Sequence, residues 1–583
     1  MNRPDTIRSN KWRVASTVPF SIQQKLGHIH PVLLQVLHNR GIGEEADIQA
    51  FLEGRYLKST DPFLLPDMER AVARIQRAIQ NDELIIVYGD FDADGVTATV
   101  LLTEALRGLG LSREQVQPYI PDRVDEGYGL NIDSLTKLKK DKKAGLVISV
   151  DCGIRSTAEV AHAREIGLDM IVTDHHSLGP QLPQAVAVVN PNRPESQYPD
   201  TKLAGVGIAF KVAQALRLTM PERAAFSDED VLDLVAIGTV ADLAPLLGEN
   251  RKLVQDGLRV MNQSRRPGLS ALARVARLPG NGLTAESIAF GIGPRINAAG
   301  RLAHAYAAAK LLASNNSIHA NKLALELNDL NRERQRLTAE LGVKAEAMID
   351  PGAPILIVAD AGFLSGVVGL VASRLAEKNY RPAIVIELGE DESRGSCRSI
   401  TEFHITKALD EAADLLVRHG GHAQAAGFTV HNKNLARFVE RMTEIAQLKL
   451  GDLELQPTID IDAEIDLESI DWALHENLAQ LEPTGNDNAT PVFMSRGVEV
   501  VSHRVVGQNG SHLQMHLSNG QSQHSGQNSS FEYRTFAAIA FRQGAWANCM
   551  PQYVDIVYTV GVNEWNGRRS LQLLVQDIRP TTP

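Results

Sequence analysis

The chain has 583 residues, of which 44% are hydrophobic and 22% are charged, enough for three or four domains of roughly 150 residues each. This excludes a small disulfide-stapled scaffold and a wholly disordered chain, and the three scattered cysteines are too few for a disulfide framework or a thiolate zinc site. The formal charge of −11 argues against a protein that coats nucleic acid by bulk positive charge.

The N-terminal segment is predicted to be helical. Residues 1–60 contain short helical stretches broken by proline and glycine, which we interpret as a cap on the next domain. The N-terminus has no apolar signal core, and no apolar run approaches the ~18 residues that span a bilayer. With so few cysteines, we expect a cytoplasmic protein and no membrane partner.

Residues 61–316 have the pattern of an α/β domain. The apolar runs LIIVYGD, GLVISVDCG and DMIVTDHH alternate with helical segments, and each run is apolar along its whole length. Strands of this kind are typical of a parallel sheet that is covered on both faces. In such sheets, ligands bind beyond the carboxyl ends of the strands, where these runs place their polar residues.

Three further segments complete the chain. Residues 317–350 are predicted to form one long helix that connects two domains, because leucines recur along one stripe. Residues 351–450, from PILIVAD to the glycine-rich GGHAQAAGF, indicate a second α/β domain. Residues 451–583 contain several short strands with turn signals, which favour a small oligonucleotide-binding (OB)-like β-barrel that binds nucleic acid.

The segment YGDFDADG carries the most chemical information. It places Asp90, Asp92 and Asp94 directly after an apolar strand and before a helix. Three close carboxylates repel one another unless a cation neutralises them. A single DxD is more often a turn in which the second aspartate caps the helix, so the triplet alone does not decide between the two interpretations.

The other strands of this domain end with the same chemistry. VISVD ends at Asp151, MIVTDHH ends at Asp174, His175 and His176, and a further acid, Asp242, comes after another apolar run. Chance rarely places so many acids and histidines at one end of a parallel sheet. Carboxylates with one or two imidazoles suit Mn²⁺ or Mg²⁺, and a pair of such ions hydrolyses phosphate esters. We therefore expect a two-metal phosphoesterase.

Two glycine-rich segments are candidates for binding phosphate. GIGPRINAAGRL supplies Arg295, Asn297 and Arg301, whose side chains can donate hydrogen bonds to phosphate oxygens. GGHAQAAGF supplies His422 between glycines that permit close backbone approach. Each segment alone is also compatible with a purely structural turn.

Together, these motifs resemble those of a known superfamily. DxD after a strand, then VISVDCG, DHH and GTVAD, in this order, resemble the four motifs of the DHH phosphoesterases, and GGHAQAAGF resembles their DHHA1 domain. PDRVDEGYGLN, LAGVGIAFK, PRINAAGRL and GVVGLVASRL are similar to stretches of the RecJ branch, whose members degrade single-stranded DNA from the 5′ end. The resemblance runs from about Asp61 through the C-terminal barrel.

The resemblance implies a role for each candidate residue. One ion would be held by four side chains: Asp94, Asp151, His175 and Asp242. A second ion would be served by Asp90, Asp92 and Asp151. His176, with Asp174, would be catalytic beside the scissile phosphate, and the substrate phosphates would be bound by Arg295, Asn297, Arg301 and His422. Tyr88 stands where some members have a histidine ligand, which leaves the occupancy of one metal position open.

The substrate implied is single-stranded DNA with a 5′ end, cut to 5′-mononucleotides in repair and recombination, with a helicase and a single-strand-binding protein as partners. An alternative is a phosphoesterase for short oligonucleotides or cyclic dinucleotides, but its relatives resemble only the two α/β domains. A non-catalytic scaffold of the same fold is a third alternative. The intact set of acids and histidines argues against it.

Overall fold

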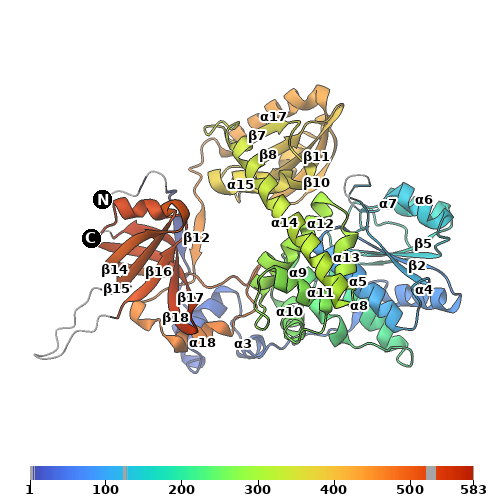
Figure 1. Cartoon of the computed structure of the whole chain (residues 1–583), viewed down its shortest axis with the longest axis horizontal. Coiled ribbons are helices and arrows are strands. Elements are labelled where there is room, and N and C mark those ends of the chain that lie inside the picture. Colours follow the sequence, from blue (N-terminus) through green and yellow to red (C-terminus); the bar gives the residue numbers. More distant parts are fainter. Residues whose placement is uncertain (1–3, 5–6, 123–125, 128, 520–533, 582–583) are drawn as a thin grey trace, which may run out of the picture. The chain divides into compact units, whose positions relative to one another are not determined.

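The computed structural model describes residues 4, 7–122, 126–127, 129–519 and 534–581 (Figure 1). Residues 123–125 and 128 of the stretch PDRVDEGYGLN lie outside this range. The chain divides into two compact units. The larger is the continuous segment Lys58–Leu455, and the smaller combines Met1–Leu57 with Gln456–Pro583.

The larger unit begins with a five-stranded sheet in the order β3-β2-β4-β5-β6, and every neighbouring pair is parallel. Its strands are β2 (Ile85–Gly89), β3 (Val116–Tyr119), β4 (Leu146–Val150), β5 (Asp169–Thr173) and β6 (Ala187–Val189). Every residue of β2 and β4 is buried, because both faces of the sheet are covered. Ile85 and Val87 belong to one hydrophobic core, whereas Ile86 and Tyr88 belong to another. The predicted α/β fold is confirmed.

Helices cover this sheet and continue beyond it. Those before and between the strands are α4 (Met68–Gln80), α5 (Ala93–Gly108), α6 (Ile132–Lys140) and α7 (Thr157–Glu165). Those after β6 are α8 (Gly205–Thr219), α9 (Leu232–Ala241), α10 (Gly248–Met261), α11 (Pro267–Val275), α12 (Gly293–Leu302) and α13 (Tyr306–Leu312). A π-helical turn, η3 (Ser287–Ile292), precedes α12.

Four strands end at the same level of the sheet. Gly89 pairs with Val150, and Val150 pairs with Thr173. Thr173 also pairs with Val189, the last residue of β6. The residues directly after these four strand ends are Asp90, Asp151, Asp174 and Asn190. The register of the sheet therefore brings three aspartates and one asparagine to a single edge.

A single helix, α14 (Ser317–Glu346), spans most of the predicted connecting segment and packs against α11, α12 and α15 (Ser365–Asn379). It leads to a mixed sheet in the order β10-β11-β9-β8-β7. The strands are β7 (Leu356–Asp360), β8 (Ala383–Glu387), β9 (Glu392–Arg398), β10 (Leu416–Gly421) and β11 (Ala425–His431). The helices are α15 (Ser365–Asn379), α16 (Ile405–Asp410) and α17 (Asn432–Leu450). Two hydrophobic cores between this sheet and its helices make it a second α/β domain.

The smaller unit contains a β-barrel. Its sheet runs β13-β14-β15-β16-β18-β17, and a further pairing between β14 and β17 closes it. The strands are β13 (Ala463–Glu464), β14 (Phe493–Val506), β15 (His512–Ser518), β16 (Phe536–Ala540), β17 (Tyr553–Trp565) and β18 (Arg568–Pro580), with the helix α18 (Trp472–Ala479) before β14. Trp546 and Tyr558 are fully buried in it. The predicted OB-like barrel is confirmed.

The N-terminal segment belongs to the barrel's unit, whereas the sequence suggested a cap on the first α/β domain. It begins with β1 (Lys11–Val14), which pairs in parallel with β12 (Thr458–Ile461), and the Trp12 Nε1–H donates to Asp577 Oδ2 at 2.8 Å. The predicted short helices come next as α1 (Phe20–Lys25), α2 (Pro31–Asn39) and α3 (Glu45–Leu52). The strand contacts account for the difference, because they draw this segment to the chain after residue 456.

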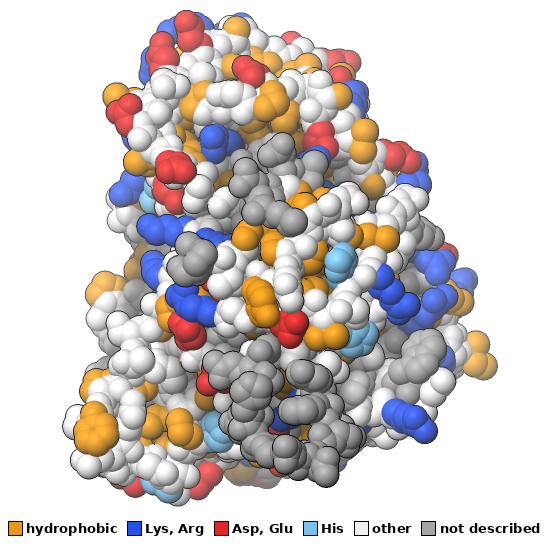
Figure 2. All heavy atoms as spheres, turned by 90° about the vertical axis from the view of Figure 1, so that its left-hand side faces the viewer, with side chains coloured by type: hydrophobic (Ala, Val, Ile, Leu, Met, Phe, Trp, Pro, Cys, Tyr) orange, Lys and Arg blue, Asp and Glu red, His pale blue; other side chains and the backbone are white. Residues whose placement is uncertain are grey.

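Three general features of the chain are its surface charge, the character of its helices and the state of its cysteines. Figure 2 shows basic, acidic and apolar side chains intermingled over one face, so the charge of −11 is not gathered there. None of the described helices combines the length and the apolar character needed to cross a membrane. Cys152, Cys397 and Cys549 are free thiols, of which the first two are buried.

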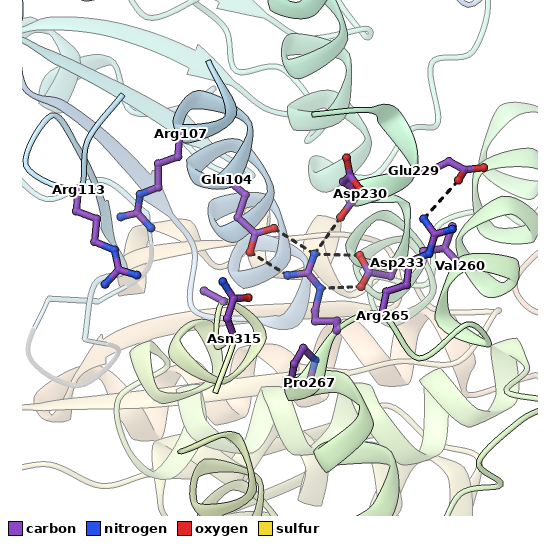
Figure 3. Close-up of a pocket in the computed structure, with 12 residues that line it drawn as sticks. Glu104, Arg107, Arg113, Glu229, Asp230, Asp233, Val260, Arg265, Pro267 and Asn315 are labelled. Carbon is purple, nitrogen blue, oxygen red and sulfur yellow. Dashed lines mark hydrogen bonds and ion pairs between the residues drawn. The ribbon is translucent and has the colours of Figure 1, made fainter. Parts of the chain in front are cut away.

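A buried guanidinium joins three helices of the larger unit. Arg266, just before α11, donates from Nε to Asp233 Oδ2 at 2.6 Å and from Nη1 to Glu104 Oε1 at 2.9 Å. These side chains line a cavity of about 380 Å³. Figure 3 shows that Glu104, Asp230 and Asp233 surround the guanidinium group, which also donates a hydrogen bond to Asp230 O.

Replacing Arg266 with leucine should therefore lower the free energy of unfolding by about 2–3 kcal/mol, because the buried Asp233 loses its charged partner. Urea unfolding measures the change. A double variant that also carries Asp233→Asn should recover most of the loss, and no recovery would contradict this account.

Candidate metal centre

The segment after β2 places its three acids through a helix start. Asp92 is the N-cap of α5, and its Oδ1 accepts hydrogen bonds from the Asp94 and Gly95 N–H groups at 2.9 and 3.0 Å. The capping interpretation is thus correct for Asp92. Capping does not exclude metal binding, because Asp90, Asp92 and Asp151 also bring carboxylate oxygens within 4.8 Å of one another.

Asp94 lies in the first turn of α5 and faces the start of α8. Its Oδ2 accepts from the Gly205 N–H at 2.7 Å, and its Oδ1 accepts from the Val206 N–H at 2.9 Å. Two glycines leave the space that the carboxyl groups of Asp151 and Asp94 occupy. A Cβ on Gly205 would lie 2.5 Å from the Asp151 Cβ, and one on Gly238 would lie 2.6 Å from Asp94 Oδ1. Sequence reasoning missed both glycines, although LAGVGIAFK and AIGTVAD contain them.

Replacing Gly205 with alanine should displace Asp151 and reduce catalytic turnover by about 100-fold, the usual cost of a misplacement near 1 Å. Steady-state kinetics on single-stranded DNA, the substrate that the sequence resemblance implies, measures the change. Gly342→Ala on α14 is the control, since its added Cβ would have no neighbour nearer than 3.9 Å. Equal turnover in both variants would contradict the steric argument.

Asp151 lies at the centre of the cluster. It comes directly after β4 with a φ of +60°, a backbone conformation that aspartate and asparagine tolerate better than most residues. Its Oδ1 lies 3.2 Å from His175 Nε2 and 3.9 Å from His176 Nδ1. The side chain is 3% exposed, so the carboxyl group is cut off from water.

Asp174 holds the two histidines. Its Oδ1 accepts from the His175 and His176 N–H groups at 2.7 and 3.0 Å and lies 2.7 Å from His176 Nδ1. Its Oδ2 accepts from the Ile154 N–H at 2.9 Å. Both carboxylate oxygens are thus occupied by protein groups, and Asp174 belongs to none of the candidate metal clusters among the described residues.

The remaining acid, Asp242, is the C-cap of α9, and its Oδ2 lies 3.8 Å from His175 Nε2. The described residues form three possible metal-binding groups, in each of which the ligand atoms lie within 4.8 Å of one another. They are Asp94, His175 and Asp242; Asp90, Asp92 and Asp151; and Asp151, His175 and His176.

Two buried atoms support a metal at this position. Asp151 Oδ1 and His175 Nε2 make no hydrogen bond among the described residues, although they lie 3.2 Å apart. Leaving such atoms without a partner is costly unless a ligand binds them. The His175 side chain also hydrogen-bonds the backbone of Leu203, an arrangement that orients metal-binding imidazoles. Carboxylates and imidazole are the ligand types that suit Mn²⁺ and Mg²⁺.

Burial and mutual repulsion set the protonation of the site. Burial, followed by repulsion from Asp92, raises the pKa of Asp94 to about 7. Burial, together with Asp94 and Asp92, raises the pKa of Asp242 to about 9 and holds the pKa of Asp151 well above its usual range. Burial, together with His176, lowers the pKa of His175 to about 4. A neutral imidazole beside high-pKa carboxyls is a site that favours a cation.

The pKa of His176 is shifted in the opposite direction to that of His175. Burial alone would lower the pKa of His176, but the hydrogen bond and charge of Asp174, together with the charges of Asp242 and Asp92, outweigh burial and raise that pKa to about 9. At neutral pH, this imidazole is therefore a cation at the rim of the cluster, where it is 33% exposed.

The predicted phosphate-binding residues fall in different places. Asn297 Oδ1 accepts from the Ala93 N–H at 2.7 Å and so fixes the start of α5. Arg295 donates to Gly291 O at 2.6 Å and to Asn328 Oδ1 at 3.2 Å. Arg301 Nη1 donates to Gly366 O at 3.2 Å and joins the two α/β domains. His422 lies near the cluster, since burial, together with the charges of His176 and Arg155, lowers the pKa of His422.

Tyr88 points away from the acids. Its hydroxyl donates to Gly129 O at 3.1 Å, and its ring packs on Tyr119 with centroids 5.0 Å apart. Burial raises the pKa of the Tyr88 hydroxyl, so it stays protonated. Tyr88 therefore stands in the hydrophobic core, with its hydroxyl bound to the backbone.

Comparison with known proteins agrees with this architecture. Family models match residues 84–239 as the N-terminal domain of the DHH family, residues 352–448 as a DHHA1 domain and residues 461–577 as a RecJ OB domain. The single-stranded-DNA-specific exonuclease RecJ of Bacillus subtilis is 36% identical over 557 residues, which are 94% of this chain and 68% of that protein. The chain belongs to the RecJ family.

Other RecJ proteins extend the match. RecJ of Salmonella typhimurium is 33% identical, with 94% of this chain and 96% of that protein covered. The crystal structure of Thermus thermophilus RecJ in complex with Mn²⁺ has a TM-score of 0.83 at 30% identity and covers 98% of this chain and 80% of its own. A second structure, in complex with Mg²⁺, has a TM-score of 0.78 at 28% identity, with 98% and 79% covered. RecJ structures with this fold thus bind the two cations that the donor set favours.

Proposed function

We propose that this chain is a metal-dependent exonuclease that degrades single-stranded DNA from the 5′ end and releases 5′-mononucleotides. The observation that carries the proposal is the cluster of five aspartates and two histidines at one sheet edge, in a chain that matches RecJ exonucleases over 94% of its length. The RecJ OB domain match supports a polymeric substrate, because OB folds bind single strands along a groove.

We assign the metal ligands from the clusters. Asp94, His175 and Asp242, with the nearby Asp151, hold one Mn²⁺ or Mg²⁺ ion, and Asp90, Asp92 and Asp151 hold a second. Bound ions of this kind activate water and stabilise the charges of a phosphoryl transfer. The carboxylates are already assembled by the sheet register and by the starts of α5 and α8, so little rearrangement is needed on binding.

The two neighbouring histidines take different roles. His175 is neutral and offers a lone pair as a ligand, whereas the protonated His176 donates a hydrogen bond to an oxygen of the scissile phosphate. Asp174 positions both imidazoles and keeps His176 charged, and its occupied oxygens argue for this role over direct proton transfer. His422 contacts the same phosphate from the second α/β domain.

Asn297 and Arg301 position other parts of the site, whereas Arg295 binds a phosphate next to the scissile one. Asn297 fixes the start of α5, and Arg301 holds the second domain in register. Burial, together with the charges of Arg332 and Arg334, lowers the pKa of Arg295. In this group of basic side chains, Arg295 binds a backbone phosphate of the DNA strand.

The test compares substrates and ligands. With Mn²⁺ or Mg²⁺, a 5′-phosphorylated single strand should be shortened to mononucleotides, while the blunt duplex and a dinucleotide should react far more slowly. Asp94→Ala and His175→Ala should lose activity, and Arg336→Gln, an exposed change on α14, should not. Faster cleavage of dinucleotides would favour the short-oligonucleotide alternative, and undiminished activity of both ligand variants would overturn the metal assignment.

The cellular context derives from this activity. A 5′ exonuclease for single strands acts in DNA repair and recombination, in the cytoplasm, where a helicase supplies the strand and a single-strand-binding protein covers it. Co-purification of the chain with either partner, in the presence of nuclease to remove bridging DNA, tests that association.

A further inference from the structure

Two consecutive histidines present their imidazoles to the same acids. His175 Nε2 and His176 Nδ1 lie 3.2 and 3.9 Å from Asp151 Oδ1, and the ring centroids are 4.4 Å apart. In an extended strand, consecutive side chains point to opposite faces. The backbone here must leave the strand conformation, and β5 indeed ends at Thr173, so the sheet ladder no longer holds these peptide groups.

Asp174 replaces the ladder on the N–H side only, by accepting from both histidine amides. The two carbonyl groups need other partners. Asn192 Nδ2 donates to His175 O at 2.7 Å, and Asn190 Nδ2 donates to His176 O at 3.0 Å. Each carbonyl of the histidine pair is therefore bound by its own asparagine.

The two asparagines form one rigid unit with Pro191 between them, which we call the NPN turn. Asn190 comes directly after β6, at the strand end whose Val189 pairs with Thr173, and it is completely buried. Its Oδ1 accepts from the Asn192 N–H at 2.8 Å, which fixes which way the Asn190 amide points. Proline restricts the backbone between them.

The NPN turn is itself tied down. Arg193, the next residue, donates to Asp67 Oδ2 at 2.8 Å, and the same oxygen accepts from the Val188 N–H at 3.1 Å. Asp67 is the N-cap residue of α4. The turn thus has a fixed anchor on either side of the asparagines.

We propose that Asn190 and Asn192 are positioning residues of the metal centre, which hold the carbonyl groups of His176 and His175, respectively, so that both imidazoles face the carboxylates. This inference rests on the metal assignment made under the proposed function. Without the turn, the histidine pair would sample strand-like conformations in which only one ring points to the acids. Groups that orient metal ligands in this way typically change metal affinity 10- to 100-fold when removed.

The experiment measures Mn²⁺ alone. Electron paramagnetic resonance titration of free Mn²⁺ gives the affinity of the wild-type chain, of Asn192→Ala and of Asn192→Gln, which keeps a carboxamide. The control is Asn262→Ala, because Asn262 also makes side-chain hydrogen bonds to backbone, to Leu258 O at 2.9 Å and Leu283 O at 3.1 Å, but away from the acids.

We expect Mn²⁺ binding about 10- to 100-fold weaker in Asn192→Ala, partial recovery in Asn192→Gln, and wild-type affinity in Asn262→Ala. Melting in EDTA should show that all three variants are folded. Wild-type Mn²⁺ affinity in folded Asn192→Ala would overturn the inference. If Asn192→Ala does not fold, the comparison of Asn192→Gln with wild type decides. A wild-type chain that binds Mn²⁺ but cleaves no DNA would instead contradict the proposed function.

Discussion

Replacing Asp151 with asparagine should abolish DNA hydrolysis and at the same time stabilise the metal-free protein. Asparagine tolerates the φ of +60° and fills the same space, so the change removes only the charge. The loss should exceed about a thousandfold in turnover, or about 4 kcal/mol in the barrier, because Asp151 is shared by two of the candidate metal-binding groups.

The stabilisation has an electrostatic origin. The carboxylates of Asp90, Asp92, Asp94 and Asp242 surround Asp151 and raise its pKa, after burial itself. In EDTA, the variant should therefore melt at a higher temperature than the wild type. With Mn²⁺ at a hundred times its Kd, the wild type should gain about 2.7 kcal/mol and the variant much less. A variant that melts lower in EDTA would contradict this account.

The same repulsion predicts how stability changes with pH. Asp94 and Asp242 have pKa values of about 7 and about 9, against about 4 in an unfolded chain. Between about pH 4 and about pH 9, these two carboxyl groups bind more protons in the folded state than in the unfolded state. The free energy of unfolding therefore falls as pH rises through this range. Thermal melts of the metal-free wild type from pH 5 to pH 9 should show this decline, and Asp151→Asn should reduce its slope.

Replacing Lys211 with methionine should lower the free energy of unfolding of the larger unit by about 3–5 kcal/mol, since one partner of a buried ion pair is removed. Lys211 is completely buried, Glu249 is 2% exposed, and their Nζ and Oε1 atoms lie 2.5 Å apart. Lys211 Nζ also donates to Thr60 O at 3.2 Å and to Gln214 Oε1 at 3.0 Å. Guanidinium chloride unfolding measures the loss.

The control separates charge from volume. Lys211→Met combined with Glu249→Gln leaves no buried charge, and the glutamine can still accept from the Tyr198 hydroxyl, so most of the stability should return. Removing the exposed ion pairs that Arg336 makes with Glu333 and Glu340, as in Arg336→Met on α14, should cost less than about 1 kcal/mol. If Lys211→Met cost no more than Arg336→Met, the buried pair would not contribute as argued.

The sequence was informative wherever the signal was local. The runs that end at Asp90, Asp151 and Asp174 were expected to be parallel strands with acids at one edge, and the register confirms that they end level. Continuous apolar runs identify buried strands, and parallel strands bring the residues at their carboxyl ends to one edge of the sheet. Most of the fold and the location of the site could be predicted from this alone.

Long-range partners could not be predicted in this way. The sequence carries no signal for the bond between Asn297 and Ala93, 204 residues away, and Asn297 resembled a phosphate ligand because it lies among glycines and arginines. Asn190 and Asn192 were missed because an Asn-Pro-Asn segment is also an ordinary turn. Their role depends on the register of β6 with β5, which a pattern along the chain does not specify.

The N-terminal strand was missed for a related reason. The four residues Lys11–Val14 are too short for a periodic signal, and their partner, Thr458–Ile461, is far along the chain. Strand propensity depends on the neighbours that a segment finds. Aromatic residues of the barrel differ in burial, since Trp546 and Tyr558 lie in its core whereas Phe541 is 54% exposed.

The pairing of β1 with β12 constrains the order in which the chain can fold during synthesis. The segment Lys58–Leu455 is continuous and can reach its native contacts as soon as it has left the ribosome. Residues before it must wait until Thr458–Ile461 has been translated, and during that time buried side chains such as Leu33 and Leu37 have no native barrel to join. The residues before Lys58 are therefore made before the larger unit but become folded after it, and this interval is when the nascent chain most needs protection from aggregation.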